Sequence, residues 1–375
     1  MEKLTDRTTL LADNASPDFA ESLPPECYRS QAFFDIEVDT IFRAGWVSVA
    51  HISQIPNIGD YICCDLLGES LIITRAESMD VHVLSRVCLH RWTPIVEGGG
   101  NTQRFVCPFH AWTYALDGTL IGAPVTGTEP GFNVSQCRLP QFRHDLQDGF
   151  IMVNLSGNAE PLGARIAPVH ERFTNYRLPD LDILGVLEYD CEYNWKILVE
   201  TFMESYHHIG VHADTLGKLY PARSTFAHPG SEAYALLENP ARPGTEVGDD
   251  EPLPVMSGLS DEEHSRFFVY NVFPCHLVTL FPSFAGWFRV LPLGPARCSL
   301  SVFILVEPSV LASLSADVKT EMLQWFDVIN QEDITVNTSQ QRGLQSRVAA
   351  AGRLNKLEAA NTQFADFIRR SVSAN

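Results

Sequence analysis

Cys88-Leu89-His90 and Cys107-Pro108-Phe109-His110 are the two short stretches that decide the fold of this chain. Cysteine thiolates and neutral imidazoles are metal ligands, so two such pairs indicate one shared metal centre. Four cysteines would indicate an ordinary ferredoxin cluster or a zinc ribbon. Two thiolates with two imidazoles instead fit a 2Fe–2S cluster in which the cysteines hold one iron and the histidines hold the other.

A zinc site with two cysteines and two histidines is the main alternative, because zinc accepts the same ligands. Against it, the second pair reads Cys-x-x-His, and the stretch lacks the two helix-borne histidines of a zinc finger. A further alternative is that the cysteines are structural and the histidines lie on the surface. Gly98-Gly99-Gly100 and Pro108 favour the cluster, because they allow the tight backbone that brings amide N–H groups to cluster sulfurs.

Composition narrows the class of protein. The chain has 375 residues, enough for two domains, and 27 basic against 46 acidic residues give a formal net charge of -19. This charge argues against nucleic acid and is compatible with a basic redox partner. No stretch is apolar enough to span a bilayer, and the polar, acidic N-terminus is unlike a signal peptide. Nine cysteines, an odd number, indicate reduced thiols, so we expect a cytoplasmic protein that binds neither nucleic acid nor membrane.

The hydrophobic pattern predicts an α+β protein with two domains. Short strand-like runs separated by turn residues extend over 40–155, and one of them leads directly into Cys88. We predict an antiparallel β domain there that carries the cluster, preceded by an N-terminal helical segment at 1–39. Residues 156–375 are predicted to form a second domain of antiparallel sheet packed by helices, a helix-grip-like arrangement.

Within the second domain, a helical stripe covers 194–212, strand-like runs fill 267–306, and further helices are expected at about 315–336 and 353–371. Residues 222–265 are rich in Pro, Gly and acidic residues and are predicted to form a long surface excursion. The helical segments at 194–212 and 315–336 carry the remaining candidate metal ligands.

The segment Glu204-x-x-His207-His208-x-x-x-His212 offers ligands for a second metal. Two histidines and a carboxylate form the facial set of non-haem Fe(II) oxygenases, which leaves positions for O2 and substrate. His208 and His212 are four residues apart and align on a helix. His207 and His212 align only if Gly210 breaks the helix. Spacing alone therefore favours His208 but leaves His207 open, and a histidine-rich helix end on the surface is the alternative to any site.

The third ligand is predicted from the periodicity of the helix at about 315–336. Its apolar stripe consists of Val318, Met322, Trp325, Phe326, Ile329 and Val336. Asp333 falls on the same stripe, and a buried carboxylate is unfavourable unless it is paired or bound to metal. We therefore predict that Asp333 is a ligand. The alternative is an aspartate near a frayed helix end, or one paired with Arg342.

Aromatic residues of the second domain are candidates for a substrate pocket, where they could stack on an aromatic ring or cage a methylated ammonium. Packing in the core is the more common role of aromatics on strands. The candidates are Tyr270, Phe273, Phe281, Phe284, Trp287 and Phe288.

The cluster segment, followed by Ala111-Trp112 and a Tyr114-x-x-Asp117-Gly118 turn, resembles the Rieske domain of ring-hydroxylating oxygenases, the alpha subunits of Rieske non-haem iron systems. One position departs from the family, which commonly has His-Arg-Gly where this chain reads His90-Arg91-Trp92. Two further segments resemble the family's iron-binding segment and its late segment. They are Asn194-Trp195-Lys196…Glu204-x-x-His207-x4-His212, and Glu332-Asp333 before Gln341-Arg342-Gly343-Leu344.

The resemblance assigns roles to these residues. It implies a Rieske 2Fe–2S cluster on Cys88, His90, Cys107 and His110, and a mononuclear Fe(II) on His207, His212 and Asp333. Asn194 and Glu204 are the catalytic candidates. In the family the acid at Glu204, commonly Asp, bonds a Rieske histidine of the neighbouring subunit, here His110, and an iron ligand of its own chain, here His207. The alternative for Glu204 is a solvated acid on a helix face.

The resemblance also implies the oxygenase component of a multicomponent system. An NAD(P)H-dependent reductase, with or without a ferredoxin, would supply electrons, and O2 would hydroxylate or oxidatively demethylate a small organic substrate. The subunits would form a ring, expected to be a homotrimer. Glu204 in place of Asp, as in relatives that oxidise quaternary ammonium compounds, favours that substrate class or another small polar compound. The alternatives are an aromatic-ring hydroxylating dioxygenase of aromatic hydrocarbon catabolism and, from another class, a Rieske electron-transfer protein without oxygenase activity.

Overall fold

The computed structural model describes residues 20–244 and 253–373. The chain divides into two compact units: Trp46–Glu160, here called the cluster unit, and the remainder, here called the sheet unit. Two predicted segments lie partly outside the described residues: the N-terminal helical segment over 1–19, and the surface excursion over its acidic run 246–251. Among the helices that are described, none combines the length and the apolar character needed to cross a membrane.

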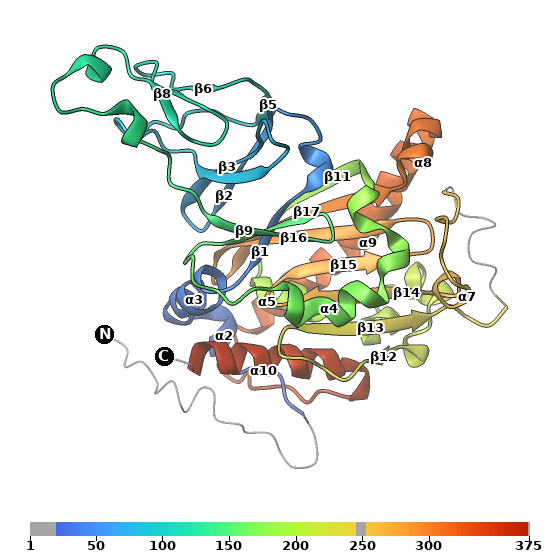
Figure 1. Cartoon of the computed structure of the whole chain (residues 1–375). Helices are drawn as coiled ribbons and strands as arrows, with labels where there is room; N and C mark the ends of the chain where they lie inside the picture. Colours follow the sequence, from blue (N-terminus) through green and yellow to red (C-terminus); the bar gives the residue numbers. More distant parts are fainter. Residues whose placement is uncertain (1–19, 245–252, 374–375) are drawn as a thin grey trace. The chain divides into compact units, whose positions relative to one another are not determined.

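The cluster unit is built from short antiparallel strands in three sheets (Figure 1). The strands, sheet by sheet, are β1 (Val47–His51), β10 (Phe150–Asn154) and β9 (Arg143–Gln147); β4 (Val81–Ser85), β3 (Glu69–Arg75), β2 (Asp60–Leu66) and β5 (Gly99–Asn101); and β6 (Phe105–Val106), β7 (Thr113–Tyr114) and β8 (Leu120–Gly122). The first candidate ligand pair follows β4, and the second lies between β6 and β7. Both pairs therefore sit where a strand ends and the backbone can turn.

A seven-stranded antiparallel sheet forms the centre of the sheet unit, in the order β11-β17-β16-β15-β14-β13-β12. In that order the strands are β11 (Asp182–Cys191), β17 (Arg297–Val306), β16 (Ala285–Gly294), β15 (His276–Leu280), β14 (Arg266–Val272), β13 (Tyr234–Pro240) and β12 (Phe226–Ala227). Helices pack against this sheet, and the predicted α+β class is confirmed.

The helices of the sheet unit position the candidate ligands. They are α2 (Glu26–Arg29), α3 (Gln31–Glu37), α4 (Gly163–Arg172), α5 (Trp195–Phe202), α6 (Leu216–Leu219), α7 (Asp261–His264), α8 (Pro308–Ser313), α9 (Ala316–Gly343) and α10 (Ala359–Ser373). The long helix α9 buries Met322, Phe326 and Ile329 and contacts both β11 and α5. Figure 1 shows α10 running beside β13, which it contacts.

Strand β13 corrects one expectation, because it lies inside the segment that the sequence predicts to be a surface excursion. The strand pairs with β14 along its whole length and is largely buried. Two of its polar side chains have partners within the fold: Asn239 Oδ1 accepts hydrogen bonds from Ser205 and Thr225, and Glu238 pairs with Arg266. The apolar run of this strand is short and lies between Pro- and Gly-rich sequences. A run of this length cannot be identified as a strand from its hydrophobic periodicity alone.

A fully buried ion pair ties the N-terminal helices to α5. Lys196 Nζ lies 2.6 Å from Glu37 Oε1, and both side chains are inaccessible to solvent. The indole N–H of Trp195 donates to the other oxygen of Glu37 at 3.3 Å. The ammonium group also lies 5.3 Å from the ring centre of Tyr28. Burial raises the pKa of Glu37, and the interaction with Lys196 opposes that rise.

A second buried acid, Glu200, lies on the same helix. Tyr28 donates its hydroxyl hydrogen to Glu200 Oε1 at 2.6 Å. Part of the Glu200 residue remains accessible, yet its carboxyl group lies inside the fold, and burial raises its pKa to about 7. Hydrogen bonding from Tyr28 and the charge of Lys196 oppose the rise, whereas Glu37 and Glu358 add to it.

Glu200→Gln tests this carboxyl group. Folding favours the protonated form of Glu200, so the free energy of unfolding is highest below the ordinary pKa of 4.5. It falls as the pH rises from there through 7. We expect Glu200→Gln to be more stable than the wild type at pH 8 by up to about 3 kcal/mol, and equal to it near pH 4.5. Urea unfolding across this range measures the difference, and a constant offset would contradict the assignment. Glu321→Gln, an exposed change on α9, is the control.

Candidate functional site

The two cluster loops have the same backbone turn. The amide of Trp92 donates to the carbonyl of Cys88 at 3.1 Å, and the amide of Ala111 donates to the carbonyl of Cys107 at 3.0 Å. Trp92 and Ala111 both have φ of +57°, in the left-handed region that bulky residues rarely adopt. Glycine adopts this region without strain, which explains why the family commonly has Gly at the position of Trp92.

The structure brings the four predicted cluster residues together. Cys88 and Cys107 are buried in one apolar core cluster, and their thiols are within hydrogen-bonding reach of each other. The rings of His90 and His110 lie 4.7 Å apart, centre to centre. The His90 ring also stacks on Trp112 at 5.0 Å. Two sulfurs inside and two imidazoles outside match the asymmetric ligand set of a Rieske cluster.

Hydrogen-bond donors surround the sulfurs, as bound thiolates require. The hydroxyl of Tyr114 lies 3.3 Å from Cys88 Sγ and accepts the amide hydrogen of Leu89 at 3.1 Å. Burial raises the pKa of the Cys107 thiol, and the amides of Phe109 and His110 oppose the rise by donating to its sulfur. The residues present therefore fit a 2Fe–2S cluster. Tyr114 appears in the sequence only as part of a turn motif, and its contact with the sulfur was not predicted.

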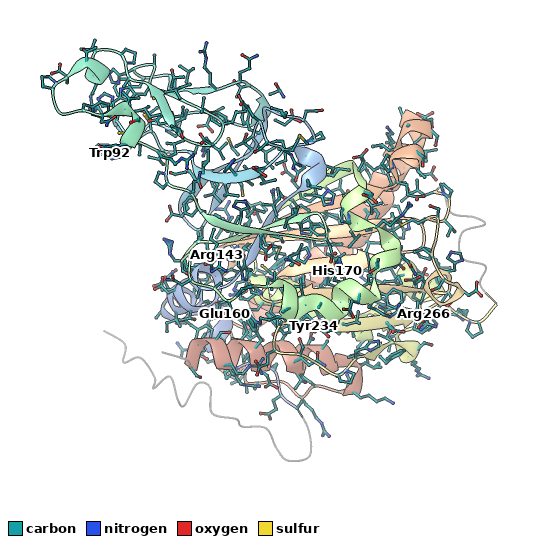
Figure 2. All side chains as sticks on the ribbon, in the orientation of Figure 1. Trp92, Arg143, Glu160, His170, Tyr234 and Arg266 are labelled. Atoms are coloured by element: carbon teal, nitrogen blue, oxygen red, sulfur yellow. The ribbon has the colours of Figure 1, made fainter. Side chains whose placement is uncertain are left out.

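The histidine side of the cluster loops faces solvent. His110 of the second loop is exposed, and Trp92 of the first loop is 79% exposed (labelled in Figure 2). Phe109 is half-exposed, and the Arg91 guanidinium lies 5.3 Å from the centre of its ring. This side of the cluster unit is therefore accessible at the surface of the described chain.

The second candidate site depends on where α5 ends. The sequence predicts one helix over 194–212, and this is wrong: α5 ends at Phe202, and a separate 3₁₀ turn covers Tyr206–Ile209. Glu204 caps that turn, because its Oε2 accepts the amide hydrogen of His207 at 3.0 Å. The break comes before His207 and not at Gly210. Helical spacing therefore no longer applies to the two histidines of the site.

The structure gathers His207, His212 and Asp333 so that one ligand atom from each lies within 4.8 Å of the others. Asp333 Oδ1 is 2.9 Å from Nε2 of His212 and 3.6 Å from Nε2 of His207. The opposite nitrogens face other carboxylates: Nδ1 of His207 is 2.7 Å from Glu204, and Nδ1 of His212 is 2.7 Å from Glu332.

These contacts fit a metal cation. A carboxylate only accepts, so each Nδ1 carries the hydrogen and each Nε2 of a neutral ring presents a lone pair. The two Nε2 atoms and Asp333 Oδ1 are then three acceptors that face one another. Asp333 Oδ1 is indeed buried without a hydrogen bond, although His212 Nε2 lies close to it. Burial alone would lower the pKa of His212, but Asp333 and Glu332 outweigh it and the net direction is upward.

His208, which spacing alone favours, lies outside this group of three. Its ring is buried, and its Nδ1 lies 3.4 Å from the carbonyl of Tyr220. Burial, together with the neighbouring His207 and His212, lowers its pKa to about 3. His208 is therefore a neutral side chain in the wall of the adjoining cavity.

A cavity of about 80 Å³ adjoins the three candidate ligands. Its aromatic lining residues are Phe202, Phe267, Phe281, Phe288, Trp325 and Phe326. Of the six aromatics predicted for a pocket, only Phe281 and Phe288 are among them, and the remainder are core residues. The four unpredicted aromatics come from α5, β14 and α9. Glu204 and Asp333 also line the cavity, and its described lining residues include no lysine or arginine.

Asn194 is not brought into the cavity. Its side chain caps α5 by accepting the amide hydrogen of Lys196 at 2.9 Å. Its amide nitrogen donates to the carbonyls of Tyr28 and Pro295 at 3.1 and 2.7 Å. All polar atoms of this fully buried side chain are thus used to fix the start of α5, which corrects the expectation of a direct catalytic role.

The fold and the two ligand sets define a class of protein, one with a 2Fe–2S domain and a separate mononuclear iron domain. Sequence comparison agrees. Residues 45–143 match the Rieske [2Fe-2S] domain, and residues 180–374 match the catalytic domain of the ring hydroxylating alpha subunit. The chain belongs to the ring-hydroxylating oxygenase alpha subunits. It is a Rieske-type oxygenase with a 2Fe–2S cluster and a mononuclear iron, so the zinc and electron-carrier alternatives do not hold.

Individual relatives differ in what they act on. The carnitine monooxygenase oxygenase subunit of Acinetobacter baumannii is 26% identical over 337 residues, covering 89% of this chain and 88% of that protein. The chloroplastic choline monooxygenase of Arabidopsis thaliana is 25% identical over 354 residues, covering 90% and 80%. The structure of naphthalene 1,2-dioxygenase from Rhodococcus sp. bound to indole superposes with a TM-score of 0.82 at 21% identity, over 98% of both chains. The shared fold therefore does not decide the substrate.

Proposed function

We propose that this chain is the oxygenase component of a multicomponent system that hydroxylates or oxidatively demethylates a small quaternary ammonium compound. The observation that carries the proposal is the small cavity beside His207, His212 and Asp333, with its aromatic walls and its acidic side chains. Carnitine and choline monooxygenases among the relatives support the same substrate class.

The cavity wall favours a cation over an anion. Aromatic faces attract an alkylated ammonium through the ring quadrupole, and Phe267, Phe281 and Trp325 supply such faces. Arg and Lys are the side chains that recognise carboxylates, and neither is found among the described lining residues. We therefore propose a substrate that carries the ammonium group without a carboxylate, closer to choline than to carnitine.

Each candidate residue then has a role. Cys88 and Cys107 would hold one iron of the cluster and His90 and His110 the other; His207, His212 and Asp333 would hold the mononuclear iron. That iron, when bound, supplies the chemistry that activates O2. Glu204 would keep the His207 ring oriented, because its carboxylate accepts the Nδ1 hydrogen and leaves Nε2 facing Asp333. Asn194 is a positioning residue that anchors α5.

The wider organisation is proposed on the family resemblance. An NAD(P)H-dependent reductase, directly or through a ferredoxin, would reduce the cluster in the cytoplasm. Glu204 would connect His207 to His110 of a neighbouring copy, which requires a ring, proposed to be a homotrimer. Residues 40–155 would form the cluster domain and 156–375 the catalytic domain, with 1–39 as an N-terminal helical segment.

Metal content gives the first test of these assignments. We expect reconstituted protein to bind about three irons per chain, two in the cluster and one mononuclear. Iron and acid-labile sulfide analysis measures the ratio, and EPR after dithionite reduction should show the Rieske signal. A ratio of about two irons per chain, with the cluster signal intact, would contradict the mononuclear site.

Oxygen uptake with a generic reductase tests the substrate class. We expect product from choline, at least about tenfold less from carnitine, and none from benzoate. Trp325→Leu should raise the KM for choline by about tenfold but leave that for its uncharged isostere 3,3-dimethylbutan-1-ol unchanged. Val328→Ala, an exposed change on the same helix, is the control. Turnover of benzoate alone would replace the proposal with aromatic-ring hydroxylation.

A further inference from the structure

Two consecutive residues of α9 hold the ring of His212 from opposite sides. Asp333 Oδ1 faces Nε2 at 2.9 Å, and Glu332 Oε2 faces Nδ1 at 2.7 Å. Adjacent residues on a helix normally point in different directions, so a single ring meets both only if it lies across the helix surface. The His212 side chain is almost fully buried in that position.

The contact with Glu332 determines which ring nitrogen of His212 carries the lone pair. A carboxylate accepts the Nδ1 hydrogen, so the lone pair lies on Nε2, the nitrogen that faces Asp333 and His207. Without that acceptor, the neutral ring can carry its hydrogen on either nitrogen and can rotate. Carboxylate partners of this kind fix both the tautomer and the orientation of a metal-binding histidine.

Thr215 holds the Glu332 carboxylate in place. Its hydroxyl donates to the same oxygen, Oε2, at 2.8 Å, and its amide donates to the carbonyl of His212 at 3.1 Å. One residue thus bonds both partners of the contact. A glutamate that merely extends into solvent would not be held at two points, even though the Glu332 side chain is 29% exposed.

The arrangement repeats on the other histidine. His207 has Glu204 on Nδ1 at 2.7 Å and Asp333 on the Nε2 side at 3.6 Å. Each candidate histidine therefore has its own carboxylate on the outer nitrogen, and the two share one carboxylate on the inner side. Glu204 is close to its histidine in sequence, whereas Glu332 is distant in sequence and ties the loop that carries His212 to α9.

We infer that Glu332 is a positioning residue for the mononuclear site, acting through the Nδ1 hydrogen bond to His212 with Thr215 as its support. The inference rests on the proposed function, because it assumes that His207, His212 and Asp333 hold the metal. If the hydrogen bond to Nδ1 orients the ring, a neutral hydrogen-bond acceptor at position 332 should be sufficient to hold His212 in place.

Metal affinity tests the inference without relying on turnover. Cluster-loaded protein stripped of its mononuclear metal by chelation is titrated with Co²⁺. We expect Glu332→Ala to weaken Co²⁺ binding about 10- to 100-fold. Glu332→Gln, which retains an acceptor for Nδ1, should stay within about threefold of the wild type, and Thr215→Val should fall between the two. Glu321→Ala removes an exposed acid from the same helix and should bind as the wild type does.

Two results would overturn the inference: wild-type affinity in Glu332→Ala, or equal losses in the Ala and Gln variants. If Glu332→Ala does not fold, Glu332→Gln and Thr215→Val still decide, because unchanged affinity in Thr215→Val together with a large loss in Glu332→Gln contradicts it. Asp333→Ala distinguishes failure of the proposed metal site from failure of the positioning role of Glu332. Wild-type affinity in Asp333→Ala refutes the metal site itself, whereas a loss there with none in Glu332→Ala refutes only the positioning role.

Discussion

Asp333→Ala is expected to abolish substrate oxidation while leaving the cluster intact. Removing the carboxylate takes away the only acidic member of the group of three that faces both Nε2 atoms, and the loss of turnover should exceed about 100-fold. The cluster loops belong to another compact unit and contain none of these residues, so the Rieske absorption and EPR signal should not change. Steady-state oxygen uptake and dithionite-reduced EPR on the same preparation measure both effects.

Glu321→Ala is the matched control for Asp333→Ala, because it also removes an acid from α9 but at an exposed position outside the cavity. It should retain wild-type turnover and about three irons per chain. Full activity in Asp333→Ala would refute the ligand assignment. Loss of the cluster signal would show instead that the substitution acts through the fold.

Lys196→Met is expected to have the largest effect on stability. The substitution leaves the carboxylate of Glu37 buried without its cation, and breaking a buried pair from one side typically removes about 3–5 kcal/mol from the free energy of unfolding. Trp195 still donates to Glu37, but one neutral hydrogen bond does not replace the ammonium group. Equilibrium unfolding in urea measures the change.

The double variant Lys196→Met with Glu37→Gln isolates the cause. It removes the uncompensated charge, so it should recover part of the stability lost in the single variant. Lys319→Met, at a partly exposed position of α9, should change stability by less than about 0.5 kcal/mol. If Lys196→Met lowers the free energy of unfolding by less than about 1 kcal/mol, then Glu37 is tolerated in its buried position without Lys196, either as a carboxylate or in its protonated form.

The proximity of the four candidate cluster residues could be predicted from the sequence because each pair is local. Cys88 and His90 lie on one loop, as do Cys107 and His110, so spacing alone restricts their geometry. Asp333, which the structure places beside His207 and His212, could also be proposed from the sequence, since helical periodicity is a strong signal over a helix as long as α9. The order of strand-like runs was sufficient to assign the α+β class.

The end of α5 could not be predicted, and with it the choice between His207 and His208. Phe202 and Met203 continue the apolar stripe, so the sequence contains no strong stop signal where the helix ends. The break depends on Glu204 capping the next turn and bonding His207, which are contacts of the folded chain. Family resemblance supplied the choice that helical spacing could not.

The cavity wall was equally difficult to predict from the sequence. Phe267 and Phe281 stack with their ring centres 4.6 Å apart and both line the cavity, whereas Phe284, stacked on Phe281 at the same distance, does not. The aromatic content of a strand does not reveal which side chains face an opening, because that depends on strand register and on the helix packed above. The contact of Glu332 with His212 could not be predicted for a similar reason, since the two residues are distant in sequence.

Strand β11 has one further consequence, for aggregation. Among the described strands it has a single neighbour, β17, so its outer edge has no strand partner there, and an unpaired edge is where another extended chain could add. Its pairing with β17 is interrupted by an irregularity between Ile183 and Gly185, and acidic side chains occur along it at Asp182, Glu188 and Asp190. Bulges and like charges both disfavour edge-to-edge addition. Copies of this chain are therefore expected to associate through other surfaces and to resist joining into a continuous sheet.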